Sequence, residues 1–183
     1  YQVGAVPHYL TKDSVEARVN RAGWKMLRDS TIFIYRNGDS IAITGIDYTE
    51  EMLKYKHSFK DSDDYNPVPV YKCLDGDVFN ITISHLPQLW KTLCNGGYSD
   101  LTLSGHIHAM QVKYDILGIS FSPSLLLYRE WSGLYENENG KLYITDGIGS
   151  VGFFARFGAN PEITVITLRN INIFTTSPSL PFS

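Results

Sequence analysis

Two short apolar segments in the middle of the chain each end in histidine, and this spacing limits the possible folds. Residues 78–84 alternate as a strand and stop at His85, while residues 101–104 form a second short strand just before His106. A short helix is predicted between them over residues 88–93. Strand, helix and strand therefore alternate, which predicts an α/β or mixed-sheet domain.

The placement of three of the histidines also predicts a metal site. Ligands of open α/β sheets gather beyond the carboxyl ends of the strands, where His85, His106 and His108 are expected to lie together. Residues i and i+2 of an extended chain point to the same side, so His106 and His108 are expected to reach one ion or two neighbouring ions. We therefore predict that these three imidazoles ligate metal.

The remaining pattern predicts one domain over residues 1–169 and a poorly ordered tail over residues 170–183, which has no charge and much Ser, Thr and Pro. A helix is expected to be capped by Asp13 or Ser14 and to end at Gly23. Further expected elements are a hairpin of residues 31–36 and 40–46 around Asn37-Gly38-Asp39, and strands over residues 111–116, 141–145 and 162–168.

Composition excludes several classes of protein. The chain has 183 residues, 43% of them hydrophobic, which is enough for one domain with a sizeable core. Its net charge of −3 leaves no basic stripe to neutralise a nucleic-acid backbone, so no nucleic-acid partner is expected. No apolar run approaches the roughly 20 residues that span a bilayer. The two cysteines, Cys73 and Cys94, are too few for a disulfide framework and are expected to be buried free thiols.

The histidine motifs resemble those of the calcineurin-like metallophosphoesterases. The chain carries His-Leu-Pro from His85 and Ser-Gly-His-Ile-His from Ser104 to His108. Three later stretches are similar to the bacterial membrane-associated or exported branch of that family, and the resemblance runs from about the first helix to Leu168. These stretches are Glu130-Trp131-Ser132-Gly133-Leu134-Tyr135, Leu142-Tyr143-Ile144-Thr145-Asp146-Gly147-Ile148-Gly149 and Pro161-Glu162-Ile163-Thr164.

The resemblance implies a sandwich of two β-sheets flanked by helices and hydrolysis of phosphate mono- or diesters at a two-metal site. It implies that His85 and His106 share one divalent ion and that His108 holds its neighbour. Such ions are Mn, Fe, Zn or similar, and imidazole does not choose among them. In the family, a hydroxide between the ions attacks phosphorus. The branch is often tethered to, or exported across, a bacterial membrane.

The chain also departs from the family pattern. The motifs Asp-x-His, Gly-Asp-x-x-Asp and Gly-Asn-His-Asp/Glu are absent, and Ala109-Met110 replaces the usual Gly-Gly. His8 occupies roughly the place of the family's catalytic histidine, although Pro7 replaces the metal-binding Asn; a frayed terminal residue is the alternative. His57 has no partner in the sequence and is expected to be exposed.

The missing carboxylates limit what the histidines can do alone. Two ions need on the order of 8 to 12 ligand positions, and three neutral imidazoles cannot offset two divalent charges. We therefore expect an incomplete phosphoesterase fold, with an N-terminal segment or another chain completing the sheet. The alternatives are a non-catalytic remnant or binding module holding one metal or none, and an unrelated zinc hydrolase or cupin-like barrel. Arg156 and Tyr128 are candidates to face an anionic substrate, although a surface position explains Arg156 equally well.

Overall fold

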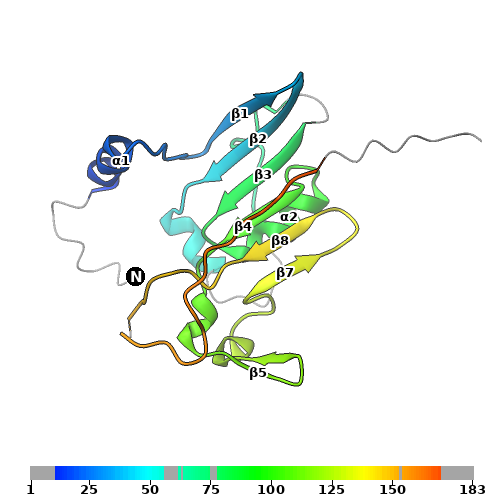
Figure 1. The fold of residues 1–183 in the computed structure, drawn as a ribbon. Coiled ribbons are helices and arrows are strands. Elements are labelled where there is room, and N and C mark those ends of the chain that lie inside the picture. The colour runs from blue at the N-terminus through cyan, green and yellow to red at the C-terminus, as the bar shows by residue number, and fades with distance from the viewer. Residues whose placement is uncertain (1–10, 56–61, 63, 75–77, 153, 170–183) are drawn as a thin grey trace, which may run out of the picture.

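The computed structural model describes residues 11–55, 62, 64–74, 78–152 and 154–169 (Figure 1). In chain order the regular elements are α1 (Lys12–Arg21), β1 (Ser30–Arg36), β2 (Asp39–Ile46), the 3₁₀ helix η1 (Glu50–Tyr55), β3 (Phe79–Ser84), η2 (Pro87–Leu89), α2 (Trp90–Asn95), β4 (Leu101–Ser104), η3 (His108–Gln111), β5 (Tyr114–Ile116), β6 (Ile119–Phe121), η4 (Pro123–Leu126), β7 (Gly133–Glu136) and β8 (Lys141–Ile144). Within these residues no helix is long and apolar enough to span a bilayer.

A six-stranded mixed sheet forms the centre of the described structure. Its strand order is β1-β2-β3-β4-β8-β7. The four central strands β2, β3, β4 and β8 run parallel, and the edge strands β1 and β7 pair antiparallel with their neighbours. The expected α/β class with a mixed sheet is therefore confirmed.

The local predictions at the start of the chain are largely confirmed. The β1–β2 hairpin turns at Asn37 and Gly38, whose φ angles of 53° and 88° suit the Asn-Gly pair. The helix ends before Gly23, as expected, but its cap is Thr11, whose Oγ1 accepts a hydrogen bond from the Ser14 amide at 3.2 Å. The cap assignment was wrong by two or three residues because several neighbouring side chains can accept from a free helical N–H.

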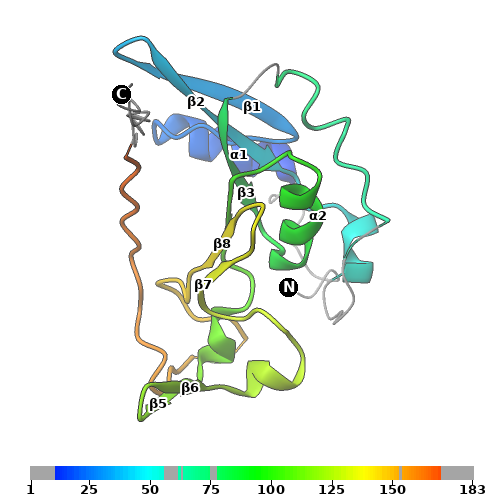
Figure 2. The same ribbon diagram turned by 90° about the vertical axis from the view of Figure 1, so that its right-hand side faces the viewer.

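One face of the sheet packs against the helices. The segment through η2 and α2 places apolar side chains at helical spacing. Some of these side chains belong to one buried cluster and the others to a second cluster. The clusters meet at α2, which lies behind β4 and β8 in Figure 1 and to one side of the sheet in Figure 2. One cluster contains Leu86, Leu89 and Leu93 from this segment, and the other contains Trp90 and Cys94. Cys94 is buried and free, whereas Cys73 is free but exposed, contrary to expectation.

Buried hydroxyls line the same face of the sheet. Thr44, Thr82 and Thr102 lie in register on three neighbouring strands, and all three are buried. Their hydrogen-bonding capacity is met within the fold: the Tyr71 hydroxyl lies 2.7 Å from Thr82 Oγ1, and Thr44 Oγ1 donates to Asn80 Oδ1 at 3.0 Å. Threonine is therefore tolerated here because each buried hydroxyl that requires a partner has one.

The opposite face of the sheet is apolar and largely open. Alternation places Ile34, Ile43, Phe79, Ile83 and Leu103 on this face, and Ile83 is 49% exposed. Parallel sheets are normally covered on both faces. On this side the segment after α1 approaches the sheet, with Leu27 directly over Gly45, and the extended segment after β8 runs away from the strands (Figure 2). This face therefore has apolar surface that the described residues do not bury.

The predicted strand over residues 162–168 is extended but pairs with no described strand. Its beginning is anchored, because the Glu162 amide donates to the Gly147 carbonyl at 3.0 Å and the Glu162 carboxylate accepts from Tyr143. Beyond that point Ile163 is 84% exposed. The alternating pattern was read correctly as extended chain, but a strand also requires a neighbour to complete its hydrogen-bond ladder.

The expected β-sandwich stays a prediction. The described residues form the six-stranded sheet and a separate two-stranded ribbon of β5 and β6, which lies at one end of the molecule (Figures 1 and 2). Strand β5 begins at Tyr114, three residues later than predicted, because residues 108–111 form the turn η3. The proposed tail over residues 170–183 lies outside the described residues.

Candidate functional site

His85 and His106 occupy equivalent positions at the ends of neighbouring strands. Strand β3 ends at Ser84 and β4 ends at Ser104, and the two strands run parallel in register. The Ser104 hydroxyl donates to the Ser84 carbonyl at 2.7 Å and joins the two strand ends. The prediction that these two histidines meet at the carboxyl edge of the sheet is confirmed.

The two rings are in direct contact. His106 Nδ1 lies 2.9 Å from His85 Nε2, and the ring centroids are 4.6 Å apart at an interplanar angle of 65°. One imidazole therefore donates a hydrogen bond to the other. Two nitrogens at right angles around an octahedral ion with bonds of about 2.0–2.1 Å also lie about 2.9 Å apart, whereas tetrahedral zinc would hold them about 3.3 Å apart. The separation of the two nitrogens is thus close to that of adjacent ligands on an octahedral ion.

Two tyrosines flank the imidazole pair. The Tyr48 ring approaches His85 edge-on with centroids 5.2 Å apart, and the Tyr128 ring approaches His106 at 6.2 Å. Burial raises the pKa of the Tyr128 phenol, which therefore stays protonated at neutral pH. Tyr128 serves as a buried wall of the pair. Sequence reasoning missed Tyr48, although its position two residues beyond β2 places it at the same edge of the sheet.

His108 is placed differently from the prediction. The premise of an extended chain is wrong here, because Ile107 has φ −87° and ψ −33° and His108 has φ 54°. The His108 ring packs against the backbone of Gly147, where an added Cβ would lie 3.0 Å from its Cε1. Burial and then the nearby Arg156 guanidinium lower the pKa of His108, and this favours the neutral imidazole that metal binding requires.

The three-histidine ligand set stays a prediction. Among the described residues there is no group of three or more His, Cys, Asp or Glu side chains placed to hold an ion. The structure brings His85 and His106 together, and His108 lies on the adjoining turn. His8 and His57 lie outside the described residues, so the catalytic role considered for His8 and the exposure expected for His57 stay predictions.

The turn after His106 is left-handed over four residues, none of which is glycine. His108, Ala109, Met110 and Gln111 have φ angles of 54°, 48°, 46° and 61°. This conformation costs roughly 1–2 kcal/mol for each ordinary L residue. The turn is held by the hydrogen bond that the Ser122 hydroxyl donates to the Ala109 carbonyl at 2.8 Å. The backbone thus follows a path suited to Gly-Gly while carrying Ala and Met, with Ala109 fully buried.

Arg156 stabilises the loops beside this turn and is not free to receive a substrate anion. Its Nε donates to the Gly149 carbonyl at 2.9 Å, one terminal nitrogen donates to the Ala159 carbonyl at 3.0 Å, and the other donates to the Asp146 carbonyl at 2.7 Å. The suggestion that Arg156 faces a substrate is therefore not supported, because backbone carbonyls already occupy its fixed fork of donors.

A cavity of about 520 Å³ adjoins the imidazole pair over the open face of the sheet. The residues that line it include His85, Lys25, and the apolar strand residues Ile83 and Leu103. A cavity with a few polar groups converging on apolar walls is typical of small-molecule sites. Lys25 adds a positive charge that suits a phosphoryl group.

Comparison with known proteins gives two curated relatives, both from Bacillus subtilis. The chain is 34% identical over 101 residues to the uncharacterised metallophosphoesterase YkuE. This match covers 54% of this chain and 34% of YkuE. The chain is 29% identical over 143 residues to the uncharacterised protein YpbG. This match covers 78% of this chain and 47% of YpbG. The chain thus spans less than half the length of either relative.

No family model matches the chain, and no solved structure is significantly similar to it. The match to YkuE nevertheless covers more than half of the chain at 34% identity. This similarity supports a relationship between the chain and the metallophosphoesterases.

Proposed function

We propose that this chain supplies the histidine side of a metal-dependent phosphoesterase site that hydrolyses phosphate mono- or diesters. The observation that carries the proposal is the contact between His85 and His106, whose ring nitrogens lie 2.9 Å apart at the ends of adjacent parallel strands. The similarity to YkuE, which is named a metallophosphoesterase, supports the same chemistry.

In this proposal His85 and His106 ligate one divalent ion, Mn, Fe or Zn, and His108 ligates its neighbour. The lowered pKa of His108 keeps its imidazole neutral and able to ligate. A divalent ion supplies charge stabilisation and a water of lowered pKa to phosphoester hydrolysis. The tyrosine walls exclude solvent from one side of the pair, and Lys25 attracts the phosphoryl group toward the adjoining cavity.

The remaining ligands, in this proposal, come from a second β-layer on the open face of the sheet. That face carries uncovered apolar side chains such as Phe79 and Ile83 beside the His85 cavity. The two relatives contain more than twice the length that aligns with this chain. An N-terminal segment or another chain that covers this face would bury the apolar surface and bring the bridging carboxylates that two ions need.

A second possible function, metal binding without hydrolysis, is favoured by the arrangement of candidate metal ligands among the described residues. Only the His85–His106 pair is in contact, and no group of three ligating side chains is present there. The chain would then be a binding module of the same relationship that holds one metal weakly or none, without hydrolysis.

Metal binding to His85→Ala, His106→Ala and His57→Ala separates these possibilities. We expect either of the first two changes to weaken Mn²⁺ or Zn²⁺ binding by at least about tenfold, since even outer-shell changes cost 10–100-fold. His57→Ala controls for loss of an imidazole elsewhere in the chain. Unchanged metal affinity in His106→Ala would refute the metal site.

Hydrolysis of p-nitrophenyl phosphate and bis(p-nitrophenyl) phosphate with Mn²⁺ then tests the enzyme itself. A rate that His106→Ala abolishes and His57→Ala preserves would support the phosphoesterase. Metal binding without any turnover, by this chain and by a chain extended to the length of its relatives, would favour the binding module.

A further inference from the structure

Asparagine directly precedes glycine at three places in this chain: Asn37-Gly38, Asn95-Gly96 and Asn139-Gly140. The backbone nitrogen of the glycine can attack the side-chain amide carbon of such an asparagine, because glycine has no side chain to hinder the approach. Each pair can therefore change chemically without an enzyme. The structure shows that the three pairs differ in how freely their reacting groups can meet.

The first pair has both reacting groups available. Asn37 and Gly38 form the exposed turn between β1 and β2, with φ angles of 53° and 88°. Within the described residues neither the Asn37 side-chain amide nor the Gly38 N–H makes a hydrogen bond. A Cβ added to Gly38 would meet nothing within 4 Å, so there is also room for a ring to close between the two residues.

The second pair is held at the end of α2. Asn95 Oδ1 accepts hydrogen bonds from the side-chain amides of Asn137 and Asn139, at 3.3 and 3.0 Å. The Gly96 N–H donates to the Thr92 carbonyl at 3.2 Å and so continues the hydrogen bonding of the helix. The attacking nitrogen and the amide that it must reach are therefore both engaged.

The third pair is held in the turn between β7 and β8. The Asn139 side chain donates to Asn95 Oδ1, and the Gly140 N–H donates to Asn137 Oδ1 at 2.9 Å. Gly140 is also closely packed, because an added Cβ would lie 2.8 Å from the Cβ of Cys94. This pair must break its hydrogen bonds before a ring can form.

We propose that Asn37 is a site of spontaneous deamidation through a cyclic imide, and that it reacts before Asn95 and Asn139. The Gly38 nitrogen, after it loses its proton to solvent base, attacks Asn37 Cγ and forms a new C–N bond. The old bond from Cγ to the side-chain nitrogen breaks, and that nitrogen takes up a proton and leaves as ammonia. Water then opens the imide at either carbonyl to give aspartate or isoaspartate. Water replaces ammonia, so no oxidant or other co-reactant is required.

The products alter the β1–β2 hairpin and add one negative charge, which takes the formal net charge from −3 to −4. Isoaspartate also lengthens the backbone of the two-residue turn by one carbon, so the pairing of Arg36 with Asp39 should be lost. Because β2 runs parallel to β3, the turn lies at the end of the sheet opposite His85 (Figure 1). The proposal is thus independent of the proposed function.

Peptide mass spectrometry of the folded chain, incubated in mildly alkaline buffer, tests the proposal. Deamidation replaces NH₂ by OH and gives a small gain in mass, and isoaspartate identifies the route through the imide. We expect Asn37 to react at least about tenfold faster than Asn95 or Asn139, since each of those pairs must first break hydrogen bonds. In urea, which removes the fold, the three rates should converge.

Three results of this experiment would overturn the proposal. The first is equal rates at the three asparagines in the folded chain, as verified by circular dichroism or not. The second is a faster reaction at Asn95 or Asn139 than at Asn37. The third is aspartate without isoaspartate at Asn37, because direct hydrolysis of the side chain would then replace the imide route.

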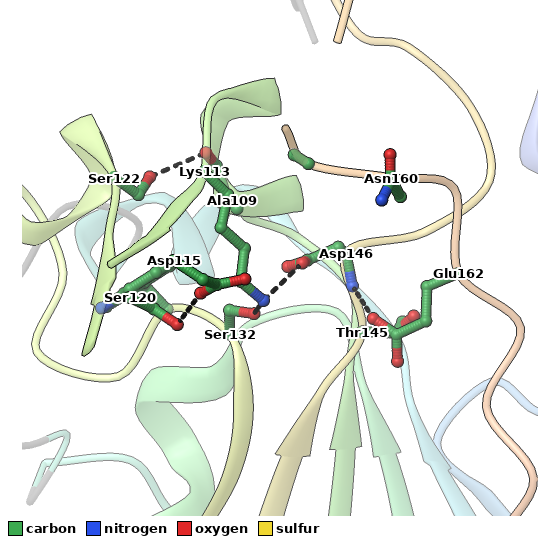
Figure 3. A network of polar contacts seen from close by, with 12 residues as sticks. Ala109, Lys113, Asp115, Ser120, Ser122, Ser132, Thr145, Asp146, Asn160 and Glu162 are labelled. Carbon is green, nitrogen blue, oxygen red and sulfur yellow. Dashed lines mark hydrogen bonds and ion pairs between the residues drawn. The ribbon is translucent and has the colours of Figure 1, made fainter. Parts of the chain in front are cut away.

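Two variants test the role of the turn. Asn37→Gln keeps a side-chain amide but needs a larger ring, so ammonia release at this turn should stop. Leu117→Asn is the matched gain, because Leu117-Gly118 has φ angles of 52° and 81° and the Gly118 N–H makes no hydrogen bond within the described residues. This turn closes the ribbon in which Ser120 donates to Asp115 (Figure 3). Release that persists in Asn37→Gln, or none at the β5–β6 turn of Leu117→Asn, would refute the proposed reaction.

Discussion

The two tight hairpins of this chain use the same backbone geometry with different residues, and exchanging those residues measures the cost of the left-handed conformation. The β1–β2 turn is Asn37-Gly38, with φ angles of 53° and 88°. The β5–β6 turn is Leu117-Gly118, with φ angles of 52° and 81°. Both are two-residue turns in which the flanking residues pair across the hairpin.

The expected effect of Leu117→Asn follows from the position of that side chain. Leu117 is 99% exposed, so its replacement loses no buried apolar area. A left-handed conformation costs an ordinary L residue roughly 1–2 kcal/mol, and asparagine avoids part of that cost through local hydrogen bonds. We therefore expect Leu117→Asn to raise the free energy of unfolding by about 1 kcal/mol. In a chain of this length that corresponds to about 2–4 °C in Tm.

Thermal unfolding followed by circular dichroism, together with amide exchange in β5 and β6, measures this change. The reverse substitution Asn37→Leu is the matched control, because the Asn37 side chain is also exposed, and it should lower the free energy of unfolding by about 1 kcal/mol. Amide exchange separates a gain confined to the ribbon from a gain in the whole domain. An unchanged or lower stability of Leu117→Asn, by both measurements, would refute the reasoning.

Three further predictions concern the loops around the candidate site. Gly158→Ala should unfold the loop or the domain, because the new Cβ would lie 1.9 Å from the Lys113 carbonyl oxygen, whereas Gly149→Ala meets nothing within 4 Å and should be nearly neutral in urea unfolding. Arg156→Lys should cost about 1.5–3 kcal/mol in the same assay, since a lysine cannot span the carbonyls that the guanidinium joins, and an unchanged midpoint would contradict this. Burial raises the pKa of Glu162, but the hydrogen bonds that its carboxylate accepts outweigh burial and lower the pKa overall. The stabilising contribution of Glu162 is therefore complete above the unfolded pKa of about 4.3 and is lost as pH falls through the lower folded pKa. Glu162→Gln should flatten the dependence of unfolding free energy on pH in this range, and an unaltered dependence would contradict the prediction.

Local patterns in the sequence predicted much of the sheet. The Asn-Gly turn located the β1–β2 hairpin, and period-two alternation located β3, β4 and β8 within a residue or so. These features are readable because turn chemistry and side-chain alternation act over a few residues. The same reasoning placed the helix end at Gly23, although the choice of cap among adjacent polar residues needed the structure.

The candidate site was only partly predictable, because turn chemistry and side-chain alternation act over only a few residues. The positions of His85 and His106 directly after two strands sufficed to predict their contact, because neighbouring parallel strands end at one edge of the sheet. The placement of His108 was missed, since the left-handed turn depends on contacts with Ser122 and Gly147, which are distant in the sequence.

The sequence alone located β1 to β4 and β8, the two histidines that follow β3 and β4, and the turn that closes the first hairpin, but it missed β6 and β7. Tertiary structure decided which partners each segment meets. Residues 162–168 are extended but pair with no strand of the described part of the chain, Arg156 binds backbone carbonyls, and the Asp146 amide donates to the Glu162 carboxylate. The physical reason is the distance along the chain over which each kind of interaction acts. Propensity and periodicity are properties of neighbouring residues, whereas ladders, buried hydrogen bonds and pockets need partners that only folding brings together.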